Sequence, residues 1–140
     1  MADTLHVDIV SAEGQIFSGE AREVYVPGSQ GPLGILPRHA PLLTLLKPGE
    51  VRVKPPEGEE QHFYVGGGAL EVQPNRITVL ADTAARAHDL DEAAALAAQQ
   101  RAQDAIASRT DKISYAEAQA ELARAVAQLK LIQKLRKVKG

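Results

Sequence analysis

The 140-residue sequence contains no cysteine and no tryptophan, and only 4% of its residues are aromatic. Without cysteine there are no disulfides, no thiolate metal ligands and no cysteine nucleophile, which suits a reducing compartment. Few aromatic side chains means few platforms on which nucleic-acid bases stack. The formal net charge is −2, so no strong basic field attracts nucleic acid, and we expect no nucleic-acid partner.

Long hydrophobic runs are also missing. The first residues carry neither the basic nor the apolar region of a signal peptide, so we expect no export. No run approaches the roughly 20 apolar residues that a transmembrane helix needs. We therefore expect contact with a membrane only through a partner. The 44% of hydrophobic residues is enough to build a core.

Glycine and proline are confined to one part of the chain. All 8 prolines lie at or before Pro74, and 10 of the 11 glycines lie at or before Gly68. Alanine, the best helix former, dominates the rest. The formal charge also divides, into −5 over residues 1–84 and +3 over residues 85–140. This pattern predicts a β domain over residues 1–86 and a helical domain over residues 87–140.

Alternating apolar and polar residues mark the strands of the first domain. Val24 and Val26 alternate with polar neighbours, as do Val51 and Val53, and turn residues separate the segments. Seven or more short strands at this spacing favour an antiparallel sandwich or barrel, because one face of each strand is polar.

Two helices are expected in the second domain. The first runs from about residue 90 to 107, residues 108–112 form the connection, and a capping box from Ser114 to Glu117 opens a second helix that reaches about residue 136. A short connection makes the pair an antiparallel hairpin. Alanine buries little area, so we expect the packing inside the hairpin to be marginal.

The sequence offers no recognisable catalytic, metal or cofactor site. The run Gly66–Gly68 lacks the Lys-Ser/Thr ending of a phosphate-binding loop, and Gly28, Gly31 and Gly34 do not have dinucleotide-binding spacing. The histidines lack metal-ligand spacing; they are His6, His39, His62 and His88. Only His39, in a proline-flanked loop, leaves two interpretations open: a solvated loop side chain or a contact residue at an interface.

The end of the second helix carries an unusual pattern. Its apolar side changes near Leu131, and Lys134 and Lys137 fall within about 40° of Lys130 at 100° per residue. Residues 130–140 contain five basic residues and no acid. Two interpretations remain open: a solvated tail, or a docking segment with an apolar ridge and a cationic flank for an acidic partner.

Motifs along the whole chain resemble the epsilon subunit of the F-type ATP synthase, in its proteobacterial form. They are LHVDIVSAEG (5–14), FSG (17–19), GILPRHAPLL (34–43), KPG (47–49), GGALEV (67–72), TVLADTA (78–84), LDEA (90–93) and AELARA (120–125). The joint match covers essentially the full length, although none of these motifs is catalytic.

The resemblance implies a flattened ten-stranded antiparallel β-sandwich followed by a helical hairpin. It also implies a non-catalytic subunit of the central stalk that binds the gamma subunit and the c-subunit ring and couples proton flow to ATP synthesis. Its C-terminal helices would reach the alpha and beta subunits and inhibit ATP hydrolysis. The location implied is the cytoplasmic face of the bacterial inner membrane, peripherally and within the complex, with no cofactor.

The same resemblance implies roles for individual residues. The ring-facing loop suggests c-ring contacts at Ser29, Gln30, Arg38 and His39. Pro32 departs from the acidic residue of close relatives. The candidates for the inhibitory contact with the beta subunit are Arg109, Lys130, Leu131, Lys134, Leu135, Arg136 and Lys137.

Some relatives bind ATP through a motif at the start of the first helix. Asp91 matches that motif, but Ala94 replaces its arginine and supplies neither charge nor donors for a phosphate. We therefore expect at most weak ATP binding. A free-standing sandwich module that binds a small ligand at its glycine-rich turns is the alternative function, and no residue pattern supports an enzyme.

Overall fold

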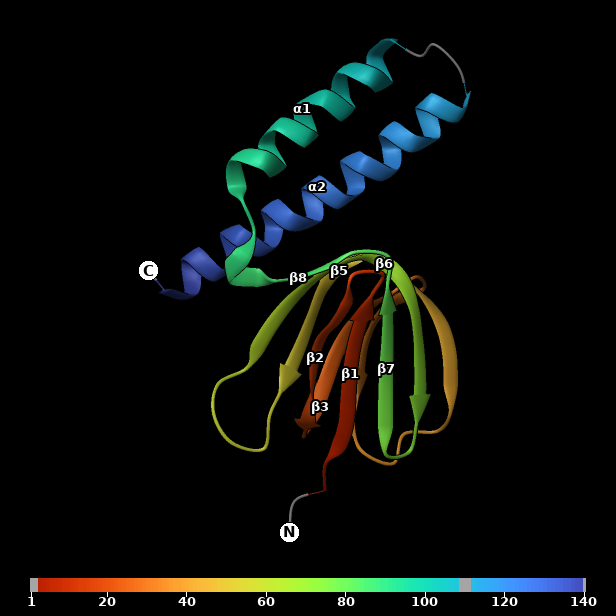
Figure 1. Cartoon of the computed structure of the whole chain (residues 1–140), viewed down its shortest axis with the longest axis vertical. Coiled ribbons are helices and arrows are strands. Elements are labelled where there is room, and N and C mark those ends of the chain that lie inside the picture. Colours follow the sequence, from red (N-terminus) through yellow and green to blue (C-terminus); the bar gives the residue numbers. More distant parts are fainter. Residues whose placement is uncertain (1–2, 109–111, 140) are drawn as a thin grey trace. The chain divides into compact units, whose positions relative to one another are not determined.

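The computed structural model describes residues 3–108 and 112–139, apart from the side chains of residues 112, 113, 138 and 139. The chain divides into two compact units, Met1–Arg86 and Ala87–Gly140. The first unit is a β-sheet domain, and the second contains two helices (Figure 1).

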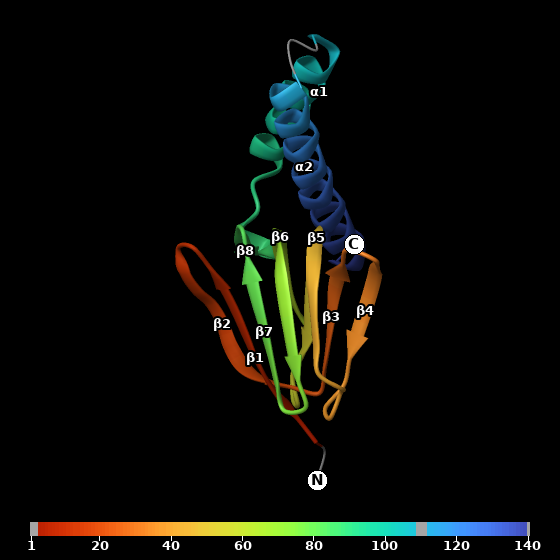
Figure 2. The ribbon, with the colours of Figure 1, turned by 90° about the vertical axis from the view of Figure 1, so that its right-hand side faces the viewer.

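Eight strands form the first unit in the part of the chain that is described. They are β1 (Leu5–Ser11), β2 (Gly14–Ala21), β3 (Glu23–Gly28), β4 (Gly31–Ile35), β5 (Leu42–Lys54), β6 (Gln61–Gln73), β7 (Arg76–Ala81) and β8 (Ala84–Arg86). Their order in the sheet is β2-β1-β7-β6-β5-β3-β4, and β8 also pairs with β6. Figure 2 shows β2 and β4 at the two outer sides of this domain.

One strand pair departs from the expected antiparallel arrangement. β1 and β7 run parallel, with Val7 opposite Ile77, while the other pairs are antiparallel. The expectation of a purely antiparallel sheet is therefore wrong. Alternation in a sequence identifies the buried face of a strand, but it carries no information on the direction of a neighbour many residues away.

The described residues contain fewer strands than the ten expected because β5 and β6 continue through predicted breaks. Pro48 of β5 pairs with Gly66 of β6, so the two breaks lie at the same level of the ladder. There the positions that join the hydrophobic core change from even to odd numbers in β5 and from odd to even in β6. Each long strand thus consists of two halves that direct opposite sets of side chains into the core, and the halves join at this irregularity.

Gly68 explains why glycine is needed at the irregularity. Its φ is +136°, and a Cβ atom there would lie 2.1 Å from the carbonyl oxygen of Leu80. Such a distance is far inside van der Waals contact, and this φ is one that other residues rarely adopt. The glycine run from 66 to 68 therefore contains a site where two backbones approach closely.

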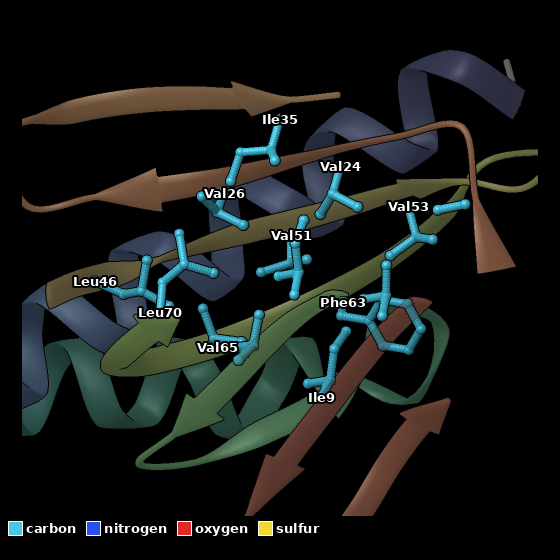
Figure 3. Packing of buried hydrophobic residues seen from close by; sticks show 14 of the residues in the cluster. Ile9, Val24, Val26, Ile35, Leu46, Val51, Val53, Phe63, Val65 and Leu70 are labelled. Carbon is cyan, nitrogen blue, oxygen red and sulfur yellow. The ribbon is translucent and has the colours of Figure 1, made fainter. Parts of the chain in front are cut away.

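The core lies on the inner faces of the strands. Its fully buried side chains include Phe63, which is 0% exposed and lies 5.3 Å from Phe17 between ring centroids. Figure 3 shows side chains from β1, β3, β4, β5 and β6 directed toward one another. The labelled members are Ile9, Val24, Val26, Ile35, Leu46, Val51, Val53, Phe63, Val65 and Leu70.

The second unit begins with a short 3-10 turn, Ala87–Asp89, followed by α1 (Glu92–Ser108) and α2 (Lys112–Lys139). The two helices form the expected hairpin. The second helix starts earlier than predicted, so Ser114 lies inside its first turn and the expected capping box is wrong. Helix ends depend on a few weak interactions, which makes them the least predictable positions.

Candidate functional site

A polar network lies on the outer face of β1, β2 and β7. Asp8, buried at 9% exposure, accepts hydrogen bonds from the Ser18 hydroxyl at 2.7 Å, Gln15 Nε2 at 3.2 Å and Arg76 Nη1 at 2.9 Å. Burial raises the pKa of Asp8, but hydrogen bonds from Ser18 and His6 and the charges of His6 and Arg76 bring it below 3.8 overall. The carboxylate is therefore ionised and satisfied, and it joins three strands.

His6 completes this network and shows that it is not a nucleophilic site. Its Nε2 lies 3.1 Å from both Asp8 Oδ1 and Ser18 Oγ, and its Nδ1 lies 2.8 Å from Glu20 Oε2. The Ser18 hydroxyl donates to Asp8, so the imidazole does not receive its proton as a general base would. A protonated imidazole between two carboxylates fits a structural role.

The other histidines lie apart from this network. His62 Nδ1 is 2.6 Å from Glu50 Oε2, and His88 lies beside Asp89 at 3.3 Å. Among the residues that the structure describes, no group of three or more acidic or histidine side chains is placed to hold a metal ion.

The candidate ring contacts do not form one cluster. Ser29 and Gln30 occupy the turn before β4, whereas Arg38 and His39 lie in the loop after it. A strand of five residues is roughly 17 Å long, so the two pairs are at opposite ends of β4.

The two ends differ in how their side chains are used. Arg38 has a φ of 67°, forms an ion pair with Asp3, and donates its backbone N–H to the Pro74 carbonyl at 2.6 Å. His39 Nδ1 donates to the Ala40 carbonyl at 2.6 Å. Ser29 and Gln30 are exposed at a tight turn. Arg38 is therefore exposed at 77% but paired, whereas the turn before β4 is tied to β5 through the Ser29 N–H and the Leu45 carbonyl, 2.9 Å apart, and presents its side chains to solvent.

Sequence reasoning missed an exposed apolar surface on the outer face of β5, β6 and β7. Leu43 is 76% exposed, Leu45 65% and Leu80 53%. Leu45 and Leu80 flank Ala69 in register, and Leu43 lies opposite Glu71. We call Leu43, Leu45, Ala69, Glu71 and Leu80 the leucine face. Its signal was present, because the segment from Leu42 to Leu46 has leucine on both sides of the alternation.

The cationic candidates on α2 are exposed, but their apolar neighbours are not. Lys130, Lys134, Arg136 and Lys137 are exposed, whereas Leu131 is only 3% exposed and Leu135 is half-buried. Leu131 is thus not an accessible ridge in this conformation. Arg109 lies outside the described residues.

Two candidates at the ends of the helices have internal partners. Arg136 Nη2 donates to Glu92 Oε2 of α1 in an ion pair. Asp91 Oδ1 accepts the backbone N–H of Ala94 at 3.1 Å, so Asp91 is the N-cap of α1. Ala94, where the ATP motif has arginine, is exposed.

No helix among the described residues is both long and apolar enough to cross a membrane.

Comparison with known proteins assigns both units to one family. Residues 4–87 match the model "ATP synthase, Delta/Epsilon chain, beta-sandwich domain", and residues 88–133 match the "long alpha-helix domain" of the same chain. The ATP synthase epsilon chain of Nitrosococcus oceani is 63% identical over 140 residues, with 100% of both chains covered. That of Alkalilimnicola ehrlichii is 60% identical over 134 residues, covering 96% of each chain.

Solved structures agree on the fold. A chain of the Euglena gracilis mitochondrial ATP synthase superposes with a TM-score of 0.69 at 15% identity, covering 98% of this chain and 82% of the other. A chain of the Tetrahymena thermophila central stalk and c-ring gives 0.63 at 11% identity, covering 93% and 97%.

The matched domains define a non-catalytic subunit of an F-type ATP synthase. The chain belongs to the ATP synthase epsilon chain family, the epsilon subunits of the central stalk, and the resemblance drawn from its motifs is confirmed.

Proposed function

We propose that this chain couples proton flow to ATP synthesis as a rotor subunit and restrains ATP hydrolysis through its helices. Residues 1–86 bind the gamma subunit and the c-subunit ring, and residues 87–140 regulate. The complex holds the chain peripherally at the cytoplasmic face of the bacterial inner membrane. The β domain serves as the flattened sandwich of the family, in which the two halves of β5 and of β6 count separately toward ten strands.

The leucine face is the observation that carries this proposal. Three leucines exposed by half or more on neighbouring strands are costly in water and typical of a surface that a partner covers. Glu71 is the charged member of this face, so a partner with apolar side chains and a nearby cation is the best fit. We assign this face to the gamma subunit.

The ring contact is assigned to the turn before β4. Ser29 and Gln30 are exposed there, whereas the Arg38 side chain is paired with Asp3 and that of His39 with the Ala40 carbonyl. A single point of contact on a rigid ring surface reaches one end of β4 and not the other. A cysteine at Gln30 should crosslink to the c subunit, and a cysteine at His39 should not; the reverse result moves the contact to the loop after β4.

The inhibitory contact with the beta subunit is assigned to the cationic side chains of α2. Lys130 and Lys137 are exposed, and a surface of one sign favours an acidic partner. Arg109, Leu131, Lys134 and Leu135 belong to the same proposed segment. Because Leu131 is buried here, its docking requires a conformational change that exposes it.

Gel filtration with the purified gamma subunit tests whether the leucine face binds gamma. The wild-type chain should elute with gamma, and the triple variant Leu43→Ser, Leu45→Ser, Leu80→Ser should not. Leu96→Ser is the matched control, because Leu96 is a 49% exposed leucine on α1, outside the β domain. A triple variant that still binds gamma overturns the assignment. Independent migration of the wild type, with melting shifted by a small ligand, supports the free-standing module instead.

A further inference from the structure

Alanine accounts for most of the buried side chains of α1 and α2; among the described residues of the two helices, Leu129 and Leu131 are the other buried hydrophobic ones. Ala95 and Ala102 of α1 are 2% and 1% exposed, and Ala118 and Ala125 of α2 are 5% and 2% exposed. Each pair is separated by seven residues, so each lies on one side of its helix. A methyl group removes little apolar area from water. Burial of these four alanines, which we call the alanine face, therefore contributes little to holding the hairpin together.

Arg101–Glu121 and Arg136–Glu92 are ion pairs that connect the two helices beside the alanine face. Arg101 of α1 donates through Nε and Nη2 to Glu121 Oε1 of α2, at 3.1 and 2.6 Å. Arg136 of α2 donates to Glu92, the first residue of α1. The second pair joins the start of one helix to the last turns of the other. It therefore closes the end of the hairpin away from the connection.

We propose that the Glu92–Arg136 ion pair, supported by Arg101–Glu121, is a latch that holds the hairpin closed. The side chains of Glu92 and Arg136 are 41% and 64% exposed, so each attraction is modest and screened by salt. Modest attractions decide the balance here because the alanine face contributes little. A latch of this strength holds the closed state while leaving it easy to open.

The latch gives Arg136 a role that differs from that of the neighbouring lysines. A guanidinium paired with Glu92 is not available to an acidic group of a catalytic subunit. Opening the hairpin frees Arg136, while Lys130 and Lys137 are exposed before and after. The consequence for ATP hydrolysis rests on the inhibitory function proposed above, whereas the latch itself is a property of the isolated chain.

Reversing one charge of the latch separates these roles. Glu92→Lys replaces attraction by repulsion and leaves every cation of α2 in place. Arg136→Glu breaks the same pair but also removes a cation. The double variant restores an attractive pair with the charges exchanged. We expect Glu92→Lys to shift the ratio of open to closed hairpin by about three- to tenfold, and the double variant to bring it back.

The absence of native cysteine makes the measurement direct. Spin or fluorescent labels on cysteines at Ala97 and Gln133, both exposed and on different helices, report the distance between α1 and α2 in the full-length chain. Asp104→Lys is the matched control: Asp104 is an exposed acid of α1 whose contact with Gln100 stays within the helix. Circular dichroism verifies that each variant keeps its helical content.

Three results support the latch: Glu92→Lys lengthens the label distance, Asp104→Lys does not, and the exchanged pair reverses the change. An unchanged distance in Glu92→Lys, or a double variant as open as the single one, overturns it. Hydrolysis by the reconstituted complex is read separately, and Glu92→Lys should strengthen inhibition. If the distance changes and hydrolysis does not, the latch stands and the proposed inhibitory function fails.

Discussion

His6 and Glu20 face each other across the β1–β2 ladder, with Nδ1 and Oε2 2.8 Å apart. The hydrogen bond to Glu20 raises the pKa of His6 above 6.5, against the opposing effect of partial burial, and Asp8 raises it further. The same hydrogen bond lowers the pKa of Glu20 below 4.5. Protonation of His6 thus strengthens its contact with Glu20, so the pairing of β1 with β2 depends on pH.

The free energy of unfolding of the β domain should fall as pH rises through the His6 titration. A group whose pKa is raised in the folded state stabilises it fully below the unfolded value, here 6.5, and loses that effect above the folded value. Urea unfolding at pH 6.0 and at roughly pH 8.5 measures the difference. His6→Gln should reduce it, and His88→Gln, an exposed control on the other unit, should not. Equal pH dependence of the His6 variant and the wild type contradicts this role.

Gly68→Ala should destabilise the β domain by about 3 kcal/mol or more, since a Cβ would meet the Leu80 carbonyl oxygen at 2.1 Å in a strained backbone conformation. Gly58→Ala is the control, because Gly58 also has a positive φ, +95°, but has open space around it. The control should lose only about 1 kcal/mol. Similar losses in the two variants, measured by denaturant unfolding, would show that the close approach is unimportant.

ATP should leave the melting temperature of the isolated chain unchanged at millimolar concentration. Ala94 offers the phosphates no cation, and Asp91 caps α1 instead. A ligand at 100 times its dissociation constant would add about 2.7 kcal/mol of stability. Inorganic polyphosphate serves as the control polyanion. A rise in melting temperature with ATP that the control does not reproduce means that other residues bind it.

Replacing Lys130, Lys134 and Lys137 with alanine should raise ATP hydrolysis by the assembled complex. The variant leaves Arg136 and its pair with Glu92 intact, so it tests the lysines alone. Exposed ion pairs contribute about 0.2–1 kcal/mol each, and losing three changes the inhibited population by roughly tenfold. High salt should mimic the variant in the wild type. Unchanged hydrolysis in a complex that has assembled normally removes the lysines from the mechanism.

Much of this molecule follows from local patterns. Alternation identified the buried Val24, Val51 and Val53, and the alanine-rich segments identified the hairpin. Contacts between segments distant in the chain could not be predicted in this way. The parallel neighbour of β1 and the partner of Arg136 depend on tertiary arrangement, which periodicity does not encode.

The candidate site shows the same division. The motif resemblance predicted the segment around β4 as one contact region. The structure shows that β4 lies between Ser29 and His39 and separates them. The run from Leu42 to Leu46 indicated a strand with apolar residues on both faces, as the leucine face requires. The same pattern is also typical of a strand that is buried on both faces. Exposure distinguishes these cases, and it comes from the fold.

The most direct test compares the full-length chain with a chain ending at Arg86 in the reconstituted ATP synthase, by measuring ATP hydrolysis and proton pumping together. The shortened chain contains each of the strands β1 to β8 and the leucine face, so it should bind gamma and sustain proton pumping, while hydrolysis rises because the helices are gone. A shortened chain that folds but neither supports pumping nor raises hydrolysis contradicts the division between a coupling β domain and a regulatory hairpin.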